Sequence, residues 1–166
     1  QFGIGRTFQI PAPFSKMTVL QNVMVGTFIH ASTMKAAKGK AWEILEMVRL
    51  DEKANQQVVN VTLEDRKRLE LARALATEPT LLLLDEAMAG LTTVEVKAAI
   101  ELIQSLHTRG LTIIVVEHVM EVILSLCHRV VVLNYGRKIA EGAPDQIVNN
   151  QEVIRAYLGE HYSARR

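Results

Sequence analysis

The feature that most constrains the fold is a short apolar run, Leu81–Leu84, that ends directly in the two carboxylates Asp85 and Glu86. The run has the length of a β-strand and no alternation of apolar and polar residues. We therefore expect both of its faces to be covered, as in the centre of a parallel α/β sheet. Ligands of open parallel sheets lie beyond the carboxyl ends of the strands, where Asp85 and Glu86 would emerge. Taken alone, the pattern also fits a core strand followed by a solvated acidic turn.

Composition narrows the class of protein. The chain has 166 residues, of which 49% are hydrophobic and 22% charged, as is ordinary for a soluble globular domain. The net charge of +1 argues against a dedicated nucleic-acid binder, which would carry a clear basic excess. The single cysteine, Cys127, permits no internal disulfide and favours a reducing cytosol. The sequence begins at Gln1 in mid-pattern, so we interpret it as a fragment whose N-terminal part is absent.

The first third of the chain predicts helices rather than strands. Thr18–Gln21 fits a capping box that opens a helix, and a second helical pattern runs over about residues 34–50. The apolar residues of this helical region, including Phe14, Met17 and Val25, are more than two short helices can bury against each other. We expect some of them to lie exposed on one patch. The competing interpretation is that they fill a small core of their own.

Further along the chain, helical and strand patterns alternate. Thr62–Asp65 is a second capping box, and it predicts a helix through Ala76 whose basic residues 66–68 face solvent. Thr92 caps a further helix, which ends at Gly110. This alternation is typical of an α/β core.

A second apolar run, Thr112–Val116, predicts another buried strand, and Glu117 and His118 follow it directly. A helix, a hairpin over residues 129–141 and two short helices then close the chain. Two strands thus end in acidic or histidine side chains.

In this order the motifs resemble the ATP-binding subunits of ATP-binding cassette (ABC) transporters, and especially the ATPases of branched-chain amino-acid importers. The resemblance covers nearly the whole chain, and its strength lies in the order and spacing of motifs that are individually weak. It is carried by Gly5–Gln9, Arg68–Leu75, Leu81–Glu86, Ala89–Leu91, Val116–His118, Gly136–Gly142 and Glu152–Gly159.

The resemblance implies an α/β fold of the P-loop NTPase (RecA-like) type, with an incomplete parallel sheet and a helical subdomain. The whole chain, 1–166, would be a partial ABC ATPase domain. The helical subdomain would cover about residues 14–60. Residues 61–166 would hold the signature helix, the Walker B strand, the switch histidine and the C-terminal region.

The resemblance also assigns roles at a nucleotide site. Asp85 falls at the Walker B position, where a carboxylate holds Mg²⁺, and Glu86 would act as general base on the attacking water. Gln9 falls at the Q-loop, whose amide contacts the metal or that water. His118 falls at the switch histidine, which contacts the γ-phosphate. We expect His118 at the start of a helix, a position that favours anions.

The first departure from the family pattern is the phosphate-binding loop. No Walker A sequence, glycine-rich and ending in Lys-Ser or Lys-Thr, occurs in the chain. We expect that loop to lie in a missing N-terminal part, and the chain alone to be inactive. The strand leading into the loop would neighbour Leu81–Leu84, so the sheet should be incomplete.

The second departure is the signature, Leu-Ser-Gly-Gly-Gln in the family and Val61–Asp65 here. Thr62 keeps a hydroxyl, but Glu64 places a carboxylate where a glycine backbone should face the partner's ATP. At about 4 Å and an effective dielectric near 20, like charges repel by roughly 4 kcal/mol. This would weaken the site unless the side chain turns away. Gly90 is also assigned to nucleotide binding.

The resemblance implies an ATPase that uses ATP and Mg²⁺ to energise import of a small solute, with branched-chain amino acids as the expected cargo. Two subunits, identical or different, would close over two ATP molecules and push on transmembrane permeases, with a solute-binding protein acting indirectly. The location would be peripheral, on the cytoplasmic face of the inner membrane.

Two other functions stay open. A non-hydrolysing regulatory or assembly subunit is favoured by the altered signature and opposed by the intact Glu86 and His118. An ABC ATPase of DNA repair would need long coiled-coil heptads, which residues 18–50 do not show.

Overall fold

The computed structural model describes residues 3–158, and the chain divides between Glu117 and His118 into two compact units. Gly159, the last residue of one family-like segment, lies outside the described residues. None of the helices within residues 3–158 has the length and apolar character needed to cross a bilayer.

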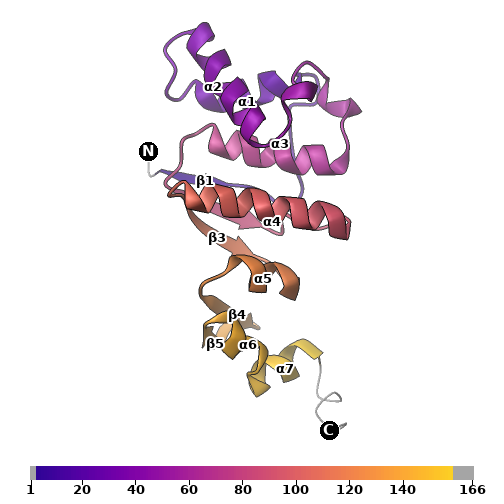
Figure 1. Cartoon of the computed structure of the whole chain (residues 1–166), viewed down its shortest axis with the longest axis vertical. Coiled ribbons are helices and arrows are strands. Elements are labelled where there is room, and N and C mark those ends of the chain that lie inside the picture. Colours follow the sequence, from indigo (N-terminus) through magenta and orange to yellow (C-terminus); the bar gives the residue numbers. More distant parts are fainter. Residues whose placement is uncertain (1–2, 159–166) are drawn as a thin grey trace. The chain divides into compact units, whose positions relative to one another are not determined.

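A three-stranded parallel sheet forms the centre of the first unit (Figure 1). Its order is β1 (Ile4–Arg6), β2 (Leu81–Asp85) and β3 (Thr112–Val116). The apolar run therefore forms the central strand, and the predicted α/β class with a parallel sheet is confirmed. The sequence patterns do not predict β1, because three residues are too few to show a period.

The expectation that a further strand would neighbour Leu81–Leu84 is wrong. β2 pairs along one edge with β1 and along the other with β3, so both of its hydrogen-bonding edges are filled. The outer edges of β1 and β3 are the two edges of this sheet that pair with no other strand among the described residues.

The expectation that Thr112–Val116 is a buried strand is also wrong. Ile114 and Val116 have 52% and 58% of their surface exposed. Residues paired in parallel register point to the same face, so Ile114 shares this open face with its partner Leu83. Leu82 and Leu84 point to the opposite face and are buried. An apolar run without alternation does not reveal which of its faces is covered, and here one face is covered better than the other.

A group of helices precedes α3 in the first unit. It consists of α1 (Val19–Thr27), α2 (Met34–Met47) and the short 3₁₀ helices η1 (Asp51–Lys53) and η2 (Val58–Asn60). The predicted capping box at the start of α1 is confirmed, because Thr18 and Gln21 bond to each other's backbone N–H groups. A Cβ atom on Gly26 would lie 2.7 Å from the Cβ of Ala76, so only glycine permits this approach of α1 to the end of α3.

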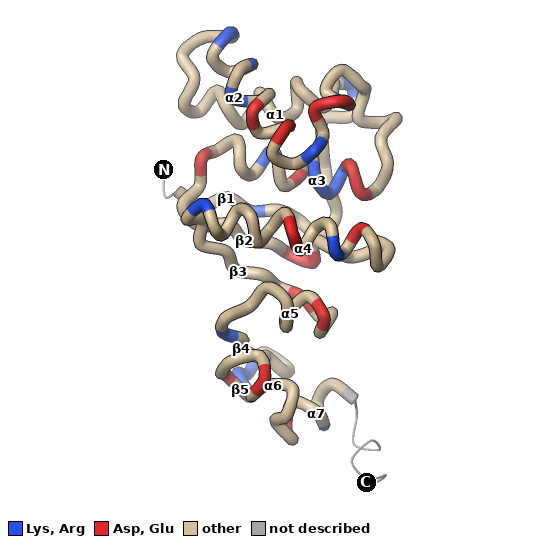
Figure 2. The backbone as a smooth tube through the Cα atoms, viewed as in Figure 1, with Lys and Arg blue, Asp and Glu red and all other residues tan. Residues whose placement is uncertain are grey.

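Two further helices flank the sheet, α3 (Leu63–Leu75) and α4 (Thr93–Thr108) (Figure 1). Both begin with the predicted capping boxes, formed by Thr62 with Asp65 and by Thr92 with Glu95. Basic and acidic residues alternate along both helices (Figure 2). The prediction that residues 66–68 face solvent is wrong, because all three are half-buried.

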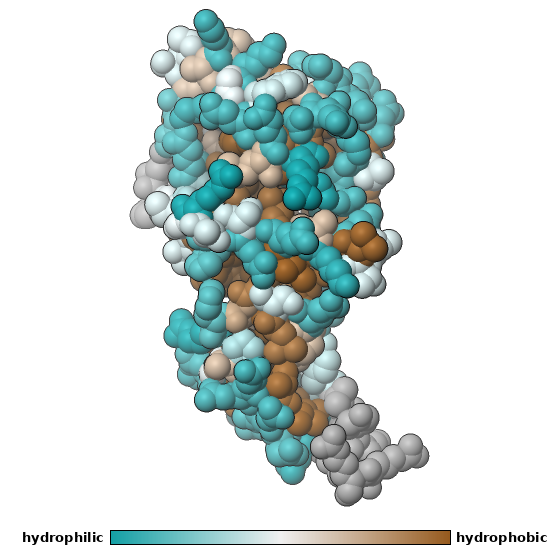
Figure 3. Space-filling model, viewed as in Figure 1, coloured by the Kyte–Doolittle hydropathy of each residue, from teal (hydrophilic) through white to brown (hydrophobic). Residues whose placement is uncertain are grey.

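The second unit contains a short helix, a hairpin and two terminal helices, in the predicted order. These are α5 (Met120–Leu126), β4 (Val130–Asn134), β5 (Arg137–Gly142), α6 (Pro144–Val148) and α7 (Gln151–Leu158). Val130, Ile147 and Val153 form its small core, and Cys127 packs against them. Burial raises the pKa of the Cys127 thiol, which makes it less reactive. Hydrophobic side chains are exposed over α5 (Figure 3), where Leu124 is among the exposed residues.

Candidate functional site

The carboxyl end of the parallel sheet brings together residues that lie nearly eighty positions apart in sequence. Asp85 is the last residue of β2, and Glu86 follows it in a left-handed conformation with φ of 44°. The Glu86 N–H donates to the carbonyl oxygen of Val116 at the end of β3, at 2.9 Å. The Gln9 Nε2 atom donates to Oε2 of Glu86 at 2.5 Å. Two of the predicted catalytic side chains, Gln9 and Glu86, are thus in direct contact.

Asp85 has a cationic partner at this end of the sheet. The Arg6 guanidinium donates to Oδ2 of Asp85 at 3.1 Å, and both side chains remain partly exposed. An accessible carboxylate that already holds a positive group has the oxygen chemistry and the charge that Mg²⁺ prefers. No cluster of three or more His, Cys, Asp or Glu side chains suited to a metal occurs within residues 3–158. One carboxylate plus phosphate oxygens is nevertheless a common set for Mg²⁺ with a nucleotide, so the residues fit this ion.

Lys67 lies in this site although the sequence patterns do not predict it. Its Nζ atom donates to the carbonyl oxygen of Gln9 at 3.0 Å and to that of Glu86 at 3.2 Å. Burial lowers the pKa of Lys67, while the nearby carboxylates of Glu117 and Glu86 act in the opposite direction. One signal could have found it: Lys67 stands four residues before the buried Leu71 on the same helical face.

Glu117 is a further carboxylate near the site. The sequence patterns put it at the end of a strand but give it no role. Its Oε1 atom accepts the N–H of Met88 at 3.2 Å, in the turn that follows β2. Its Oε2 atom is buried without a hydrogen-bond partner among the described residues. Glu117 thus ties the end of β3 to the turn after β2, and its charge acts to raise the pKa of Lys67.

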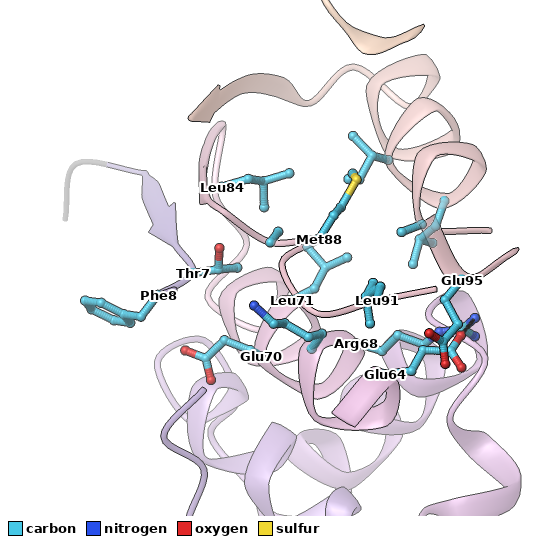
Figure 4. Close-up of a pocket in the computed structure, with 15 residues that line it drawn as sticks. Thr7, Phe8, Glu64, Arg68, Glu70, Leu71, Leu84, Met88, Leu91 and Glu95 are labelled. Carbon is cyan, nitrogen blue, oxygen red and sulfur yellow. Dashed lines mark hydrogen bonds and ion pairs between the residues drawn. The ribbon is translucent and has the colours of Figure 1, made fainter. Parts of the chain in front are cut away.

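The Val61–Asp65 segment uses its polar side chains locally. The Thr62 hydroxyl donates to Oδ2 of Asp65 at 2.9 Å and accepts the Asp65 N–H. Glu64 forms an ion pair with Arg68 one turn along α3, and Glu95 of α4 lies close to both (Figure 4). The Glu64 carboxylate is therefore paired within its own helix, and its effect on a partner's ATP stays a prediction.

Gly90 lies against the start of α3. Its φ is +79°, and a Cβ atom there would lie 3.1 Å from Cδ2 of Leu63. Glycine suits both the left-handed backbone and this close approach. The turn after β2 is thereby brought up against the first residue of α3.

His118 is the first residue of the second unit and is exposed. Its carbonyl oxygen accepts a hydrogen bond from the Tyr157 hydroxyl of α7. It lies two positions after the end of β3 and two before the start of α5, so the prediction that it stands where a strand gives way to a helix is confirmed. Its contact with a phosphate stays a prediction.

A small cavity of about 40 Å³ lies within the first unit and is lined by α3, β2 and α4. Its lining is mostly apolar and includes Leu71, Leu84 and Ile103 (Figure 4 shows the first two). Pockets for small-molecule ligands are about ten times larger, so this cavity is not a nucleotide site. The candidate site is the group of polar side chains at the end of the sheet.

Comparison with known proteins decides the family. Residues 2–89 match the ABC transporter family, and residues 137–163 match the branched-chain amino acid ATP-binding cassette transporter family. The chain is 38% identical over 178 residues to the high-affinity branched-chain amino acid transport ATP-binding protein LivG of Escherichia coli (strain K12). That match covers 96% of this chain and 69% of LivG. The chain belongs to the ABC transporter ATPase family.

A second curated relative and a solved structure support the same family. The ATP-binding protein BraF of Pseudomonas aeruginosa is 36% identical, over 95% of this chain and 68% of BraF. The crystal structure of the ADP conformation of MJ1267, an ATP-binding cassette of an ABC transporter, superposes with a TM-score of 0.82. That structure is 27% identical, with 96% of this chain and 69% of that chain covered. The predicted fold, an ABC-type P-loop NTPase, is confirmed.

The start of α3 in this ABC ATPase chain depends on one buried carboxylate. Asp65 accepts hydrogen bonds from Lys53 at 2.8 and 2.7 Å and from Thr62 at 3.1 and 2.9 Å. Burial by itself would raise the pKa of Asp65, but the hydrogen bonds from Lys53 and Thr62 outweigh it, and the pKa is lowered. The folded state therefore favours the ionised form.

Asp65→Asn is expected to destabilise the chain by about 1–3 kcal/mol at pH 7, because it removes charge-assisted hydrogen bonds from a buried position. A lowered folded-state pKa gives stability that is present above the unfolded value of 3.8 and is lost as pH falls through the folded value. The difference between Asp65→Asn and wild type should therefore shrink below about pH 4. Urea unfolding at pH 7 and pH 3 measures it. A difference that stays constant with pH would contradict the ion-pair account.

Proposed function

We propose that this chain carries the metal-binding and general-base residues of a nucleotide site, and that ATP hydrolysis at this site energises an importer of branched-chain amino acids. The observation that carries the proposal is the pair Gln9–Glu86, which lies at the carboxyl end of β2 directly beside Asp85. A carboxylate that holds a metal, followed by one that can accept a proton and is oriented by an amide, fits the metal-binding and general-base parts of an ATP hydrolysis site.

The roles of these side chains follow from their chemistry. Asp85 would hold Mg²⁺ through its carboxylate, and the Gln9 side-chain oxygen would be a further ligand. The ion pair between Arg6 and Asp85 would break when Asp85 binds the metal. Bound Mg²⁺ would supply charge stabilisation for the transferred phosphoryl group. Glu86 would take the proton of the attacking water at Oε1 or Oε2, and the Gln9 amide would orient that carboxylate. His118 would donate to the γ-phosphate.

The solute and partners are proposed from the relatives. LivG and BraF are branched-chain amino acid transport proteins. One related cassette, MJ0796, is known as a dimer bound to ADP and phosphate. We therefore expect two ATPase subunits, on the cytoplasmic face of the inner membrane, acting on transmembrane permeases. The region 14–60 would be the helical subdomain that meets a permease.

Transport in proteoliposomes tests this function. The complete gene product, assembled with its permease and solute-binding protein, should accumulate radiolabelled leucine only when ATP is enclosed. Excess unlabelled isoleucine or valine should compete, whereas lysine should not. Competition by an unrelated solute alone would assign a different cargo. Leucine uptake without ATP consumption would contradict the ATPase.

The altered signature favours one alternative, a subunit that binds nucleotide without hydrolysing it. Glu64 carries a negative charge where the family has glycine, but Arg68 neutralises it within the same helix. If this neutralisation keeps the site active, then Arg68 is needed only while Glu64 is present. A double-mutant cycle isolates this dependence.

Arg68→Gln is expected to lower ATP turnover by about ten- to hundredfold, because an uncompensated carboxylate would repel the partner's ATP. The double variant Glu64→Gly with Arg68→Gln should recover most of that turnover. Phosphate release by the complete gene product measures both. Equal losses in the single and double variants would show that Arg68 supports the fold rather than the site. Absence of turnover in the wild type would favour the non-hydrolysing subunit.

A further inference from the structure

We infer that Lys67 is a positioning residue that fastens the loop of Gln9 and the turn of Glu86 to the signature helix α3. The inference deepens the proposed ATPase and rests on it, because it assigns Lys67 to the geometry of the proposed general base. Lys67 donates hydrogen bonds to the backbone carbonyl oxygens of both predicted catalytic residues.

The contacts around Lys67 form a closed link. Its Nζ atom donates to the carbonyl oxygens of Gln9 and Glu86, and the side chains of these two residues are joined to each other. Backbone and side chain of Glu86 are therefore both tied to Gln9, the first through Lys67 and the second directly. Two attachments restrict a carboxylate more than one does, and the rate of proton transfer depends on that restriction.

Placing the Lys67 ammonium in a half-buried position costs free energy unless its donors form hydrogen bonds. A half-buried ammonium loses hydration, and burial lowers the pKa of Lys67 for that reason. The carboxylates of Glu86 and Glu117 offset part of this cost by their charge. The Lys67 ammonium thus has carbonyl acceptors on two separate segments and two carboxylates nearby, an environment that suits a positive charge.

The link also joins two distant parts of the proposed machinery. Lys67 stands five residues after Thr62, within the first two turns of α3. Thr62, Glu64 and Asp65 form the start of the same helix, so a movement of the signature segment moves Lys67 with it. Through Lys67, that movement reaches the backbone of Gln9 and Glu86. We therefore place Lys67 on the route between the signature and the general base.

Three variants test the inference. Lys67→Met keeps most of the unbranched apolar stem of the side chain but removes the donors, whereas Lys67→Arg keeps a cation with several donors. Lys97→Met, at an exposed lysine of α4, is the matched control. We expect Lys67→Met to lower kcat of the complete gene product by about ten- to hundredfold with KM for ATP changed less than about threefold. Lys67→Arg should lie within about threefold of wild type, and Lys97→Met should be unchanged.

Amide hydrogen exchange gives a second readout that needs no ATP hydrolysis. In the 166-residue chain, Lys67→Met should speed exchange in the peptides that contain Gln9 and Glu86, and leave α1 and α2 unchanged. Faster exchange across the whole first unit would show a purely structural role and overturn the inference. Unchanged exchange with unchanged kcat would overturn it as well. If the wild type hydrolyses no ATP, the proposed function fails, while the exchange result still decides the role of Lys67.

Discussion

Glu86→Gln is expected to lower ATP turnover of the complete gene product by about 10²- to 10⁴-fold, the range of general-base catalysis. An amide cannot accept the proton of the attacking water. Because the amide has nearly the shape of the carboxylate, the contact with Gln9 and the turn after β2 should survive. Nucleotide affinity should therefore change little. Phosphate release and a nucleotide-binding titration, performed on the same preparation, separate these two effects.

The matched control for Glu86→Gln comes from the same unit. Glu101→Gln makes the identical change at an exposed position of α4 and should leave turnover unaffected. His118→Ala should reduce turnover less completely than Glu86→Gln, because it removes a phosphate contact rather than the base. Turnover by Glu86→Gln within about threefold of wild type would remove Glu86 from the general-base role.

Charged substitutions at Phe14 and Met17 are expected to abolish solute uptake and to spare the basal ATPase. These side chains are 44% and 37% exposed in the segment before α1. Exposed apolar residues of this kind commonly mark a partner site. The Arg73 guanidinium lies over the Phe14 ring, 5.1 Å from the ring centroid. The proposed partner is a permease helix.

The measurements for Phe14→Asp and Met17→Glu are leucine uptake in proteoliposomes and phosphate release by the isolated subunit. Val94→Asp places a charge on an apolar residue of α4 that is 78% exposed, and it should leave both activities unchanged. Loss of uptake and ATPase together would show that Phe14 and Met17 hold the fold. Retained uptake would place the permease contact elsewhere.

Local chemistry explains why many elements could be predicted from the sequence. A threonine that caps a helix with a partner three residues later needs no distant contact, so the helices after Thr18, Thr62 and Thr92 begin where predicted. The turn at Tyr135 and Gly136 has two left-handed residues in succession, and it gives the predicted hairpin for the same reason. The length and apolar character of Leu81–Leu84 also determine a strand without help from other segments.

The resemblance to a family identified Gln9, Asp85 and Glu86 as site residues, and their chemistry could be argued from residue type alone. The structure adds that Gln9 contacts Glu86 and that Arg6 contacts Asp85. The roles of these residues in hydrolysis stay predictions. No sequence pattern showed the Arg6 contact, because its two partners are separated by 79 positions.

Tertiary structure alone decided which side chains of the helices and strands enter the site. Lys67 was expected to face solvent as part of a basic triplet, yet its ammonium is drawn in by carbonyl oxygens from two other segments. The open face at Ile114 and the filled edges of β2 depend likewise on which strands pair and which helices pack. Helix caps and turns are set by bonds within a few residues, so the sequence determines them. Burial and strand order depend on contacts between distant segments, and these exist only once the chain has folded.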